Sequence, residues 1–465
     1  MPIDSNVSRN IATLEYQKFA RIFDDTRFPP ITAILPGYDG VPVPQVWPKY
    51  AVLTYDIGQN GGPDPINSSP FGNNASTDAF GRLRTSVPDT IHNCKQTYDN
   101  APLIYNTATV NGGVAIYDNA NSSTVMQVSA NGDAVIRQTR LYCNYQPGKG
   151  QLAFITFSMP DSAGLVSRVG LFDGDTTTPY ANPHGFYFEN NNGNLSVNIA
   201  NYGGGQSSQT VPQSAWSIDT LDGNGPSQIT LDVTKAQILV IDYEWLGVGR
   251  VRYGFNIDGI TYYVHAFNNA NNVIYPYLKD PNDPVRYEIR SIGGAGVMRQ
   301  ICSSVMSEGG SQENGILYSC NTGVSGIGNI SAGQRAPIIN IRLKANRLSA
   351  TLNVQDFAAM ASSTTNSLVE IVLNGTVSGT PLSFNGITNS NVEYAVCNAG
   401  DSIANGTILY SAYFNKSSNT TSALSQSLFA IGSNIDGTRD VLSVCVTPYN
   451  GNERYFAALN WLEFL

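Results

Sequence analysis

The sequence predicts an all-β protein: two antiparallel β-sandwich, jelly-roll-like domains behind an extended N-terminal arm with one short helix. Composition is the first reason. Only 13% of the 465 residues are charged, whereas Gly (44) and Tyr (25) are abundant. Gly suits turns, and Tyr, like Val, Ile and Thr, suits strands. The second reason is that short runs of alternating apolar and polar residues recur between Gly/Asn turns, as in a sandwich.

The arm is expected at residues 1–78. Residues 8–23 place apolar side chains at helical spacing, so they predict a short amphipathic helix, which Pro29 and Pro30 would end. Residues 58–76 are rich in Gly, Asn and Pro and predict a linker. Such an arm cannot form a core of its own, so we expect it to lie on a partner subunit or on the body of the protein.

Two β domains are expected after the arm, at 79–335 and 336–465. In the first, strands are expected at 112–117, 123–128, 133–142, 150–158, 168–171, 184–189, 194–199, 228–232 and 237–267. In the second, strands are expected at 338–343, 348–354, 368–373, 392–397, 407–413 and 441–447, with a short helix at 354–362.

The hairpin around residues 237–257 allows its register to be deduced. Its two alternating runs bring their apolar faces together only across an odd-numbered connection, since a one-residue slip turns every side chain over. A three-residue loop at 246–248 satisfies this condition. Glu244 then lies opposite Arg250, and Asp242 opposite Arg252, which predicts a structural ladder of opposite charges.

Asp242 and Glu244 also provide the one enzyme hypothesis. Two carboxylates at i and i+2 on a strand share a face with Cα atoms about 6.6 Å apart, and glycosidases use such pairs as acid and nucleophile. A carboxylate paired with an arginine has its pKa lowered, which makes it a poor general acid. The ladder is therefore favoured, and the chain is not expected to be an enzyme.

Residues 260–267 suggest a different activity. Tyr263, His265 and Phe267 share one face of the predicted strand, and an exposed aromatic face on an antiparallel sheet can stack on sugars. These three residues are the glycan-binding candidates of the sequence. The alternative is that both faces of this strand are buried between two sheets.

No metal or cofactor site is expected. His92, His184 and His265 are far apart in sequence, without cysteines or carboxylates at ligand spacing. Asp173-Gly-Asp175 resembles the start of a calcium loop but lacks its later Gly and Glu, so it predicts a turn. The six cysteines form no CxxC pair and are expected to be free and mostly buried.

Charge and hydropathy exclude two classes of partner. The net charge of −9 and pI near 4.9 argue against nucleic-acid binding, which requires a basic face. No run of about 18 apolar residues occurs, so no membrane insertion is expected. The N-terminus lacks the pattern of a signal peptide, so synthesis in a cytoplasm is expected.

Several blocks resemble a family of tailed-phage virion structural proteins associated with tails or fibres. The blocks are AFGRLRTS at 79–86, YQPGKGQ at 145–151, WLGVGRVRYG at 245–254, DPVRYEI at 283–289 and ICSSVMSEGG at 301–310. The last domain resembles another recurrent phage element through INIRLK at 339–344 and VEIVLN at 369–374. The second block has Gly-Lys-Gly where the family has Gly-Lys-Ser, a difference at a turn.

The resemblance covers roughly residues 79 to 415 and implies a place in the virion. The arm at 1–78 has no counterpart in it; we expect the arm to dock on other virion proteins, and we expect a homotrimer by analogy with phage appendages. A tail-fibre or baseplate role is the first expectation. A capsid-decorating or head-fibre protein, and a receptor-recognition module that binds host surface glycan, are the alternatives.

Overall fold

The chain divides into two units, Met1–Thr77 and Asp78–Leu465. In the first unit, β1 (Ile31–Ala33) pairs antiparallel with β2 (Val43–Gln45). The predicted helix at 8–23 and linker at 58–76 lie outside the described residues. The computed structural model describes residues 31–33, 43–45, 78–79, 87–310, 315–363, 365–414, 420–423 and 430–464.

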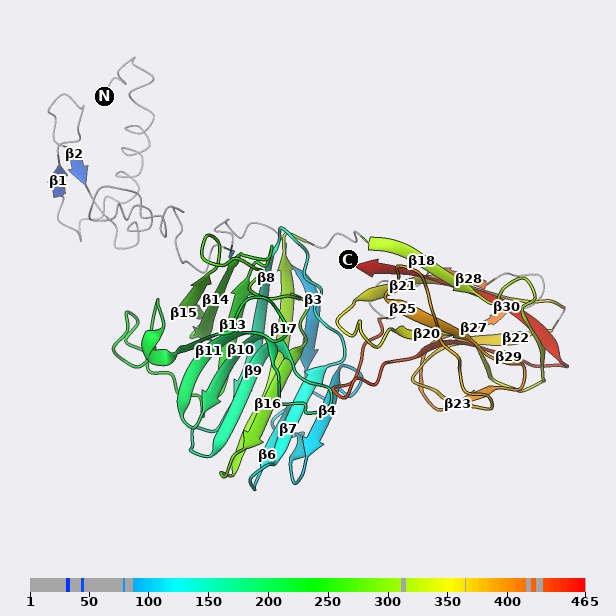
Figure 1. Ribbon diagram of the computed structural model, residues 1–465, viewed down its shortest axis with the longest axis horizontal. Coiled ribbons are helices and arrows are strands. Elements are labelled where there is room, and N and C mark those ends of the chain that lie inside the picture. The colour runs from blue at the N-terminus through cyan, green and yellow to red at the C-terminus, as the bar shows by residue number, and fades with distance from the viewer. Residues whose placement is uncertain are drawn as a thin grey trace, which may run out of the picture. The chain divides into compact units, whose positions relative to one another are not determined.

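The second unit begins with a sandwich of two large antiparallel sheets, called here the first sandwich (Figure 1). One sheet has the strand order β12 (Gln209–Pro212), β11 (Asn194–Asn201), β10 (His184–Asn191), β9 (Leu165–Asp173), β16 (Val285–Ser291), β7 (Ala134–Thr139) and β4 (Tyr105–Val110). The other has the order β15 (Ile260–Asn268), β14 (Arg250–Ile257), β13 (Gln237–Tyr243), β8 (Gly150–Ser158), β17 (Gly296–Glu308), β6 (Ser123–Val128) and β5 (Val114–Asp118), and β3 (Asp89–Lys95) also pairs with β17.

Alternation along the strands builds the core between these sheets. On β14, Tyr253 and Phe255 point inward from one sheet, and Phe188 of β10 points inward from the other. The Phe188 and Phe255 rings meet edge to face with centroids 5.3 Å apart, and Phe188 lies 6.0 Å from Phe157 of β8. Burying aromatic rings in such pairs is a main source of sandwich stability.

The described residues between 315 and 464 form the second sandwich, also antiparallel. One sheet contains β18 (Gly315–Asn321), β30 (Glu453–Phe464), β21 (Leu352–Ala361) and β28 (Thr420–Ala423), with β19 (Ile327–Ile330) also on β30. The other runs β24 (Asn385–Gly386), β25 (Val392–Val396), β20 (Ala336–Leu343), β29 (Leu442–Pro448), β22 (Ser367–Leu373) and β27 (Thr407–Phe414), and β23 (Thr376–Ser378) pairs with β26 (Ser402–Ala404).

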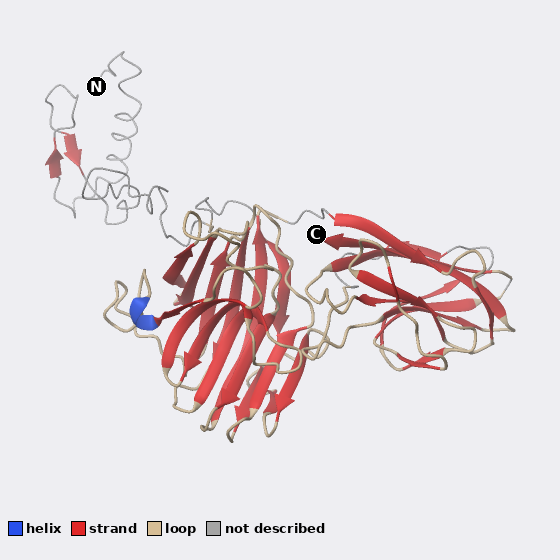
Figure 2. Ribbon diagram, in the orientation of Figure 1, coloured by secondary structure: helices blue, strands red, loops and turns tan. Residues whose placement is uncertain are grey.

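The all-β prediction is confirmed. Figure 2 shows strands and loops throughout the described part of this unit, apart from one short 3₁₀ turn, η1 (Gln213–Ala215). The described residues contain two antiparallel β-sandwiches, as predicted. Within the described part of the chain, no helix has the length and apolarity that crossing a membrane requires.

The helix predicted at 354–362 is wrong, because this segment is part of strand β21. The pairing of β21 with β30 shifts register between Val354 and Asp356. This bulge puts Val354 and Phe357, three positions apart, into the same core. A spacing of three is typical of a helix, which explains the error.

The strand predicted at 228–232 is also absent. Only an isolated bridge joins Asp222 to Thr230. Side-chain hydrogen bonds organise this loop instead: the Asp219 carboxylate accepts from the backbone N–H of Leu221 at 3.0 Å and of Ser227 at 2.8 Å. Leu231 packs into the core of the first sandwich. The apolar residues that suggested a strand at 228–232 are thus explained by burial within a loop.

The predicted hairpin register is present in β13 and β14. Asp242 pairs with Arg252 across the ladder. Glu244 and Arg250 also face each other, since the Glu244 N–H donates to the Arg250 carbonyl at 3.0 Å. The three-residue connection therefore places both charge pairs on one side of the sheet, as the alternation required.

A segment just before β29 joins the two sandwiches. Asp440 forms a 2.6 Å ion pair with Arg140, which follows β7 of the first sandwich. Ile435 packs against Ala134 and Ile136 of β7. These contacts, made by Ile435 and Asp440 of the second sandwich with the β7 region of the first, are called here the junction. A pocket lies beside it.

Candidate binding pocket

A pocket of about 520 Å³ with both polar and apolar walls lies where one end of the first sandwich meets loops of the second. Its polar lining includes carboxylates and amides, and two tyrosines also line it. The first sandwich contributes Tyr142, Asp173, Asp175, Asn182, His184, Tyr202, Asp280 and Asn282, and the second contributes Asn346, Arg347 and Asn434.

Hydrogen bonds across the junction fix the walls. The Arg140 guanidinium donates to Asn434 Oδ1 at 2.6 Å. The Ser349 hydroxyl of the second sandwich donates to Asp280 Oδ2 of the first at 2.5 Å. Asp280 in turn accepts the backbone N–H of Asn282 at 3.0 Å. The pocket therefore has preorganised polar walls drawn from both sandwiches.

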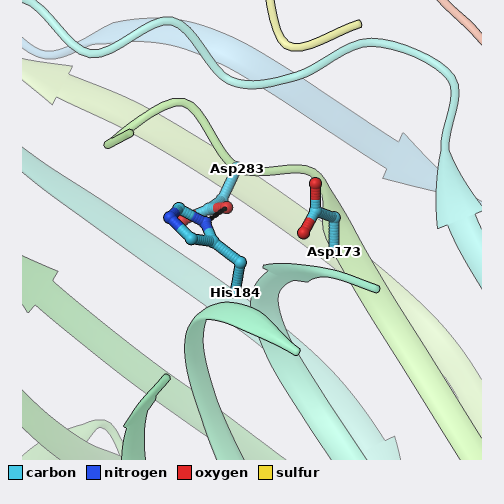
Figure 3. A group of neighbouring side chains, drawn as sticks. All are labelled: Asp173, His184 and Asp283. Atoms are coloured by element: carbon cyan, nitrogen blue, oxygen red, sulfur yellow. Dashed lines mark hydrogen bonds and ion pairs between the residues drawn. The ribbon is translucent and has the colours of Figure 1, made fainter. Parts of the chain in front are cut away.

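Asp173, His184 and Asp283 form a cluster at this pocket (Figure 3). Asp173 is the last residue of β9, His184 is the first of β10, and the two are direct partners in the antiparallel ladder. Asp283 lies just before β16, which pairs with the other side of β9. One donor atom from each residue lies within 4.8 Å of the others, and His184 Nδ1 is 3.4 Å from Asp283 Oδ1.

Burial disfavours the charged form of every member of this cluster. It raises the pKa of Asp283 well above its usual value, with the nearby Asp173 and Asp280 charges adding to the effect. Burial also raises the pKa of Asp173, although His184 and Arg286 oppose the shift. Burial lowers the pKa of His184. The cluster thus concentrates groups that lack the solvation their charges need.

Two atoms of the cluster have no hydrogen-bond partner among the described residues: His184 Nε2 and Asp283 Oδ2. His184 is only 7% exposed and Asp283 only 1%. Tyr142 does serve Asp173, donating its hydroxyl to Oδ2 at 3.2 Å. Buried polar atoms in folded proteins nearly always have a hydrogen-bond partner. The two unpartnered atoms therefore mark the cluster as a candidate binding site.

Asp175, the second carboxylate of the Asp173-Gly-Asp175 motif, organises its turn. Its Oδ1 accepts from the Thr177 hydroxyl at 2.6 Å, the Thr177 N–H at 2.7 Å and the Thr178 N–H at 3.1 Å. These bonds, the Thr177 hydroxyl first, hold the pKa of Asp175 well below its usual value. The motif therefore combines a turn-forming Asp175 with an Asp173 that joins the cluster.

The charged ladder lies elsewhere, inside the protein. Asp242 and Arg252 form a 2.5 Å ion pair in which both side chains are fully buried. The Tyr263 hydroxyl donates to Asp242 Oδ2 at 2.6 Å. Glu244 Oε1 accepts the backbone N–H of Arg250 at 3.0 Å. Neither Asp242 nor Glu244 lines the pocket.

Tyr263, His265 and Phe267 are buried, as the alternative interpretation of this strand expected, with exposed fractions of only 4%, 8% and 4%. They therefore offer no exposed aromatic face to a glycan. A register shift in β15 leaves Val264 as an extra residue, so Tyr263 and His265 no longer share a simple alternation. The Arg252 guanidinium lies over the Tyr263 ring, with its Cζ atom 4.2 Å from the ring centroid. Phe267 packs in the core of the first sandwich.

Tyr202 lines the pocket and is 55% exposed. Tyr275 is 56% exposed but is not among the pocket residues. The Tyr275 ring packs over Gly205 in the loop that follows Tyr202; a Cβ at Gly205 would lie 3.2 Å from the ring. Sequence alternation identified neither residue, because both lie in loops.

Spacing along the sequence also hid the cluster. His184 is the one histidine of three that meets two carboxylates here, while His92 bonds the Ser303 hydroxyl at 2.8 Å and His265 accepts from the Ser217 N–H at 3.1 Å. Asp173 and His184 flank one hairpin connection, a signal the sequence did contain. Asp283 is 99 positions from His184, and only the sheet order brings it close.

No protein-family model matches the chain, and no curated protein matches it. Solved structures similar to part of it include a Bacillus licheniformis β-glucanase, 10% identical, covering 47% of this chain and 97% of the glucanase, with TM-score 0.30. A legume lectin-like domain from Entamoeba histolytica is 14% identical, with coverages of 48% and 98% and TM-score 0.30. The VIP36 exoplasmic/lumenal domain in its Ca2+/Man-bound form is 9% identical, with coverages of 49% and 93% and TM-score 0.31. At these TM-scores the similarities carry no argument about function.

Proposed function

We propose that this chain is a non-catalytic carbohydrate-binding protein and that the pocket between its two sandwiches is the binding site. The observation that carries the proposal is the chemistry of the walls. A sugar hydroxyl both donates and accepts hydrogen bonds, so it is matched by carboxylates such as Asp280 and by amides such as Asn282 and Asn434. The Tyr202 ring at the same pocket offers an apolar face for the C–H side of a sugar.

The burial of Asp242 supports a binding role rather than a hydrolytic one that uses the Asp242/Glu244 pair. A glycosidase needs its two carboxylates at a cleft where a substrate can reach them. Asp242 is instead fully buried against Arg252 and Tyr263. Asp173 and Asp280 line the pocket and would serve there as hydrogen-bonding groups.

We further propose that the chain acts as a virion structural protein of a tailed phage. The support is the resemblance of its sequence blocks, two of which form central parts of the first sandwich: 245–254 in the β13–β14 hairpin and 283–289 in β16. Cryo-EM of the intact particle tests this. Density on the tail is expected; density over the capsid would replace the tail role with a decorating role, and absence from the particle would contradict both.

Binding of glycans to the full chain tests the first proposal. A glycan array should identify ligands, and titration calorimetry should then show binding to the wild type that falls at least tenfold in Tyr202→Ala. Tyr413→Ala is the matched control, because Tyr413 is 73% exposed on the second sandwich and is not among the pocket residues. Binding to no glycan, or equal loss in both variants, would refute the pocket assignment.

A further inference from the structure

The geometry points to a divalent-cation site formed by Asp173, His184 and Asp283, which would hold a first-row transition ion such as Mn²⁺ or Zn²⁺. The inference concerns the pocket of the proposed function and rests on that function only for the sugar that would meet the ion. The cation site itself is argued from the strands, the donor atoms and the charges of the cluster.

The backbone presents the three side chains without need of a loop movement. Asp173 and His184 are ladder partners at adjacent strand ends, and Asp283 enters from the strand on the other side of β9. Figure 3 shows the His184 ring beside the Asp283 carboxylate, with the Asp173 carboxylate turned toward the same space. Donor atoms bound at ~2.1 Å to one ion lie ~3 to ~4 Å apart. Atoms already within 4.8 Å of one another need only small side-chain rotations to reach that arrangement.

An independent observation points to a ligand at this cluster. Asp283 is 1% exposed, yet its Oδ2 has no hydrogen-bond partner among the described residues. A buried ionised carboxylate is costly unless it is paired or coordinates a metal. Of the ion pairs formed by described residues, the one at this cluster joins Asp283 to His184, and neither Asp173 nor Asp283 pairs with a lysine or arginine there.

The local charge also favours a cation. Asp173 and Asp283 present carboxylate oxygens within 4.8 Å of the His184 imidazole, and the Asp280 carboxylate lines the same pocket. The Arg286 guanidinium, which acts on Asp173, forms an ion pair with Glu288 at 2.9 Å. A divalent ion would balance two carboxylates at once, and the neutral imidazole would provide a ligand without adding charge. The positively charged Lys279 lines the same pocket, but no ion pair between it and the cluster occurs in the described part of the chain.

The donor set indicates the kind of ion. Carboxylates suit Mg²⁺, Ca²⁺ and Mn²⁺, whereas imidazole suits Zn²⁺ and other transition metals. One imidazole with two carboxylates is therefore expected to select Mn²⁺ or Zn²⁺ over Ca²⁺. Three protein ligands leave positions open on the ion, and these positions would face a pocket large enough for a sugar ring, whose hydroxyls could complete the coordination.

The first experiment measures metal binding without any sugar. Untagged full-length protein is stripped with EDTA and titrated calorimetrically with MnCl2, ZnCl2 and CaCl2. We expect one Mn²⁺ or Zn²⁺ per chain, with weaker Ca²⁺ binding, and at least tenfold weaker Mn²⁺ and Zn²⁺ binding in His184→Gln and Asp283→Asn. His265→Gln is the matched control, since it removes another buried histidine outside the cluster.

A second measurement guards against variants that fail to fold. The Tm of Asp283→Asn in EDTA should match or exceed that of the wild type, because a neutral amide replaces a buried carboxyl whose Oδ2 has no hydrogen-bond partner among the described residues. Added Mn²⁺ should raise the Tm of the wild type but not that of the variant. In the wild type, Mn²⁺ should broaden the ring NMR signals of His184 and leave those of His92 and His265 sharp.

These outcomes separate the two proposals. Metal binding at His184 without any glycan binding upholds the cation site and overturns the proposed function. Glycan binding with no metal binding at His184 overturns the cation site and upholds the pocket. Metal binding that His184→Gln and Asp283→Asn leave unchanged is surface binding and also overturns the cation site.

Discussion

Arg140 and Asp440, 300 positions apart in the sequence, form a 2.6 Å ion pair that joins the two sandwiches. The Asp440 side chain is only 5% exposed, and it also accepts from the Asn374 amide at 2.7 Å and from the Gly432 N–H at 3.1 Å. This junction stands next to the pocket, so its integrity should govern both stability and binding.

Arg140→Gln should destabilise the protein by ~3 kcal/mol, because it leaves a nearly buried carboxylate without its countercharge. Urea unfolding followed by fluorescence would measure the change. Arg342→Gln is the control: its ion pair with Glu393 is more exposed, and Glu393 keeps a second arginine, Arg439, so the expected loss is ~1 kcal/mol or less. An equal loss of unfolding free energy in the two variants would show that the Arg140–Asp440 pair stabilises the protein no more than an exposed ion pair does.

Gly432→Ala should disrupt the same junction by steric conflict. A Cβ at this position would lie 1.9 Å from the Arg140 carbonyl oxygen, a backbone atom that cannot move alone. We expect a loss of at least ~2 kcal/mol in the free energy of unfolding. Gly400→Ala provides the comparison, since a Cβ there meets nothing within 4 Å. Similar stability of the two variants would mean that the backbone at Gly432 can shift away from the Arg140 carbonyl at little energetic cost.

Tyr253→Phe tests a hydrogen bond between the sheets of the first sandwich. The buried Tyr253 hydroxyl on β14 donates to the Asn198 carbonyl on β11 at 2.6 Å. Its removal should cost ~1 kcal/mol, since the ring remains packed and one buried bond is lost. Tyr202→Phe, at an exposed ring, should leave the urea midpoint unchanged. An unchanged free energy of unfolding in Tyr253→Phe would show that water replaces the hydroxyl as the hydrogen-bond donor.

Glu453 should make stability depend on acid pH. Burial acts to raise its pKa, but hydrogen bonds from Ser363, Ser362 and the Arg454 N–H outweigh burial and lower the pKa from 4.5 to about 2. A carboxyl with a lowered folded pKa stabilises the fold above its unfolded pKa, and this contribution disappears as pH falls from about 4.5 to about 2. The Tm difference between wild type and Glu453→Gln should therefore shrink over that range; a constant difference would contradict the lowered pKa.

Cys302 should be the first thiol to react with iodoacetamide. All six cysteines are free in the structure, and Cys302 is exposed while the other five are buried. Burial raises the pKa of Cys94 to about 11 and that of Cys143 to about 12, which further slows their reaction. Mass spectrometry of the native protein should find one rapid modification, absent from Cys302→Ser. Early labelling of Cys94 or Cys143 would indicate that the first sandwich opens readily.

The sequence predicted the fold best where alternation was uninterrupted. Val251, Tyr253 and Phe255 alternate strictly, so their inward face and the pairing of Asp242 with Arg252 could be deduced. Bulges defeated the same reasoning in β21 and β15, because one extra residue changes the spacing of the buried side chains. No local pattern signals such a bulge.

The pocket was beyond sequence reasoning for a different reason. Its residues lie at strand ends and in loops, where no period applies. Asp173 and His184 meet through a hairpin, but Asp283 joins them only because β16 pairs with β9 across more than a hundred residues. The Tyr202 ring, likewise, is placed by a loop rather than by an alternating strand.

The junction at Arg140 has a consequence for the order in which the molecule is made. A ribosome completes every strand of the first sandwich before it reaches the second, yet one wall of the pocket, at Asn434, is synthesised long afterwards. A growing chain could thus bury its first core while its recognition site still lacked a side. Ligand capture would then report that synthesis had passed residue 434 and that both sandwiches had closed on each other.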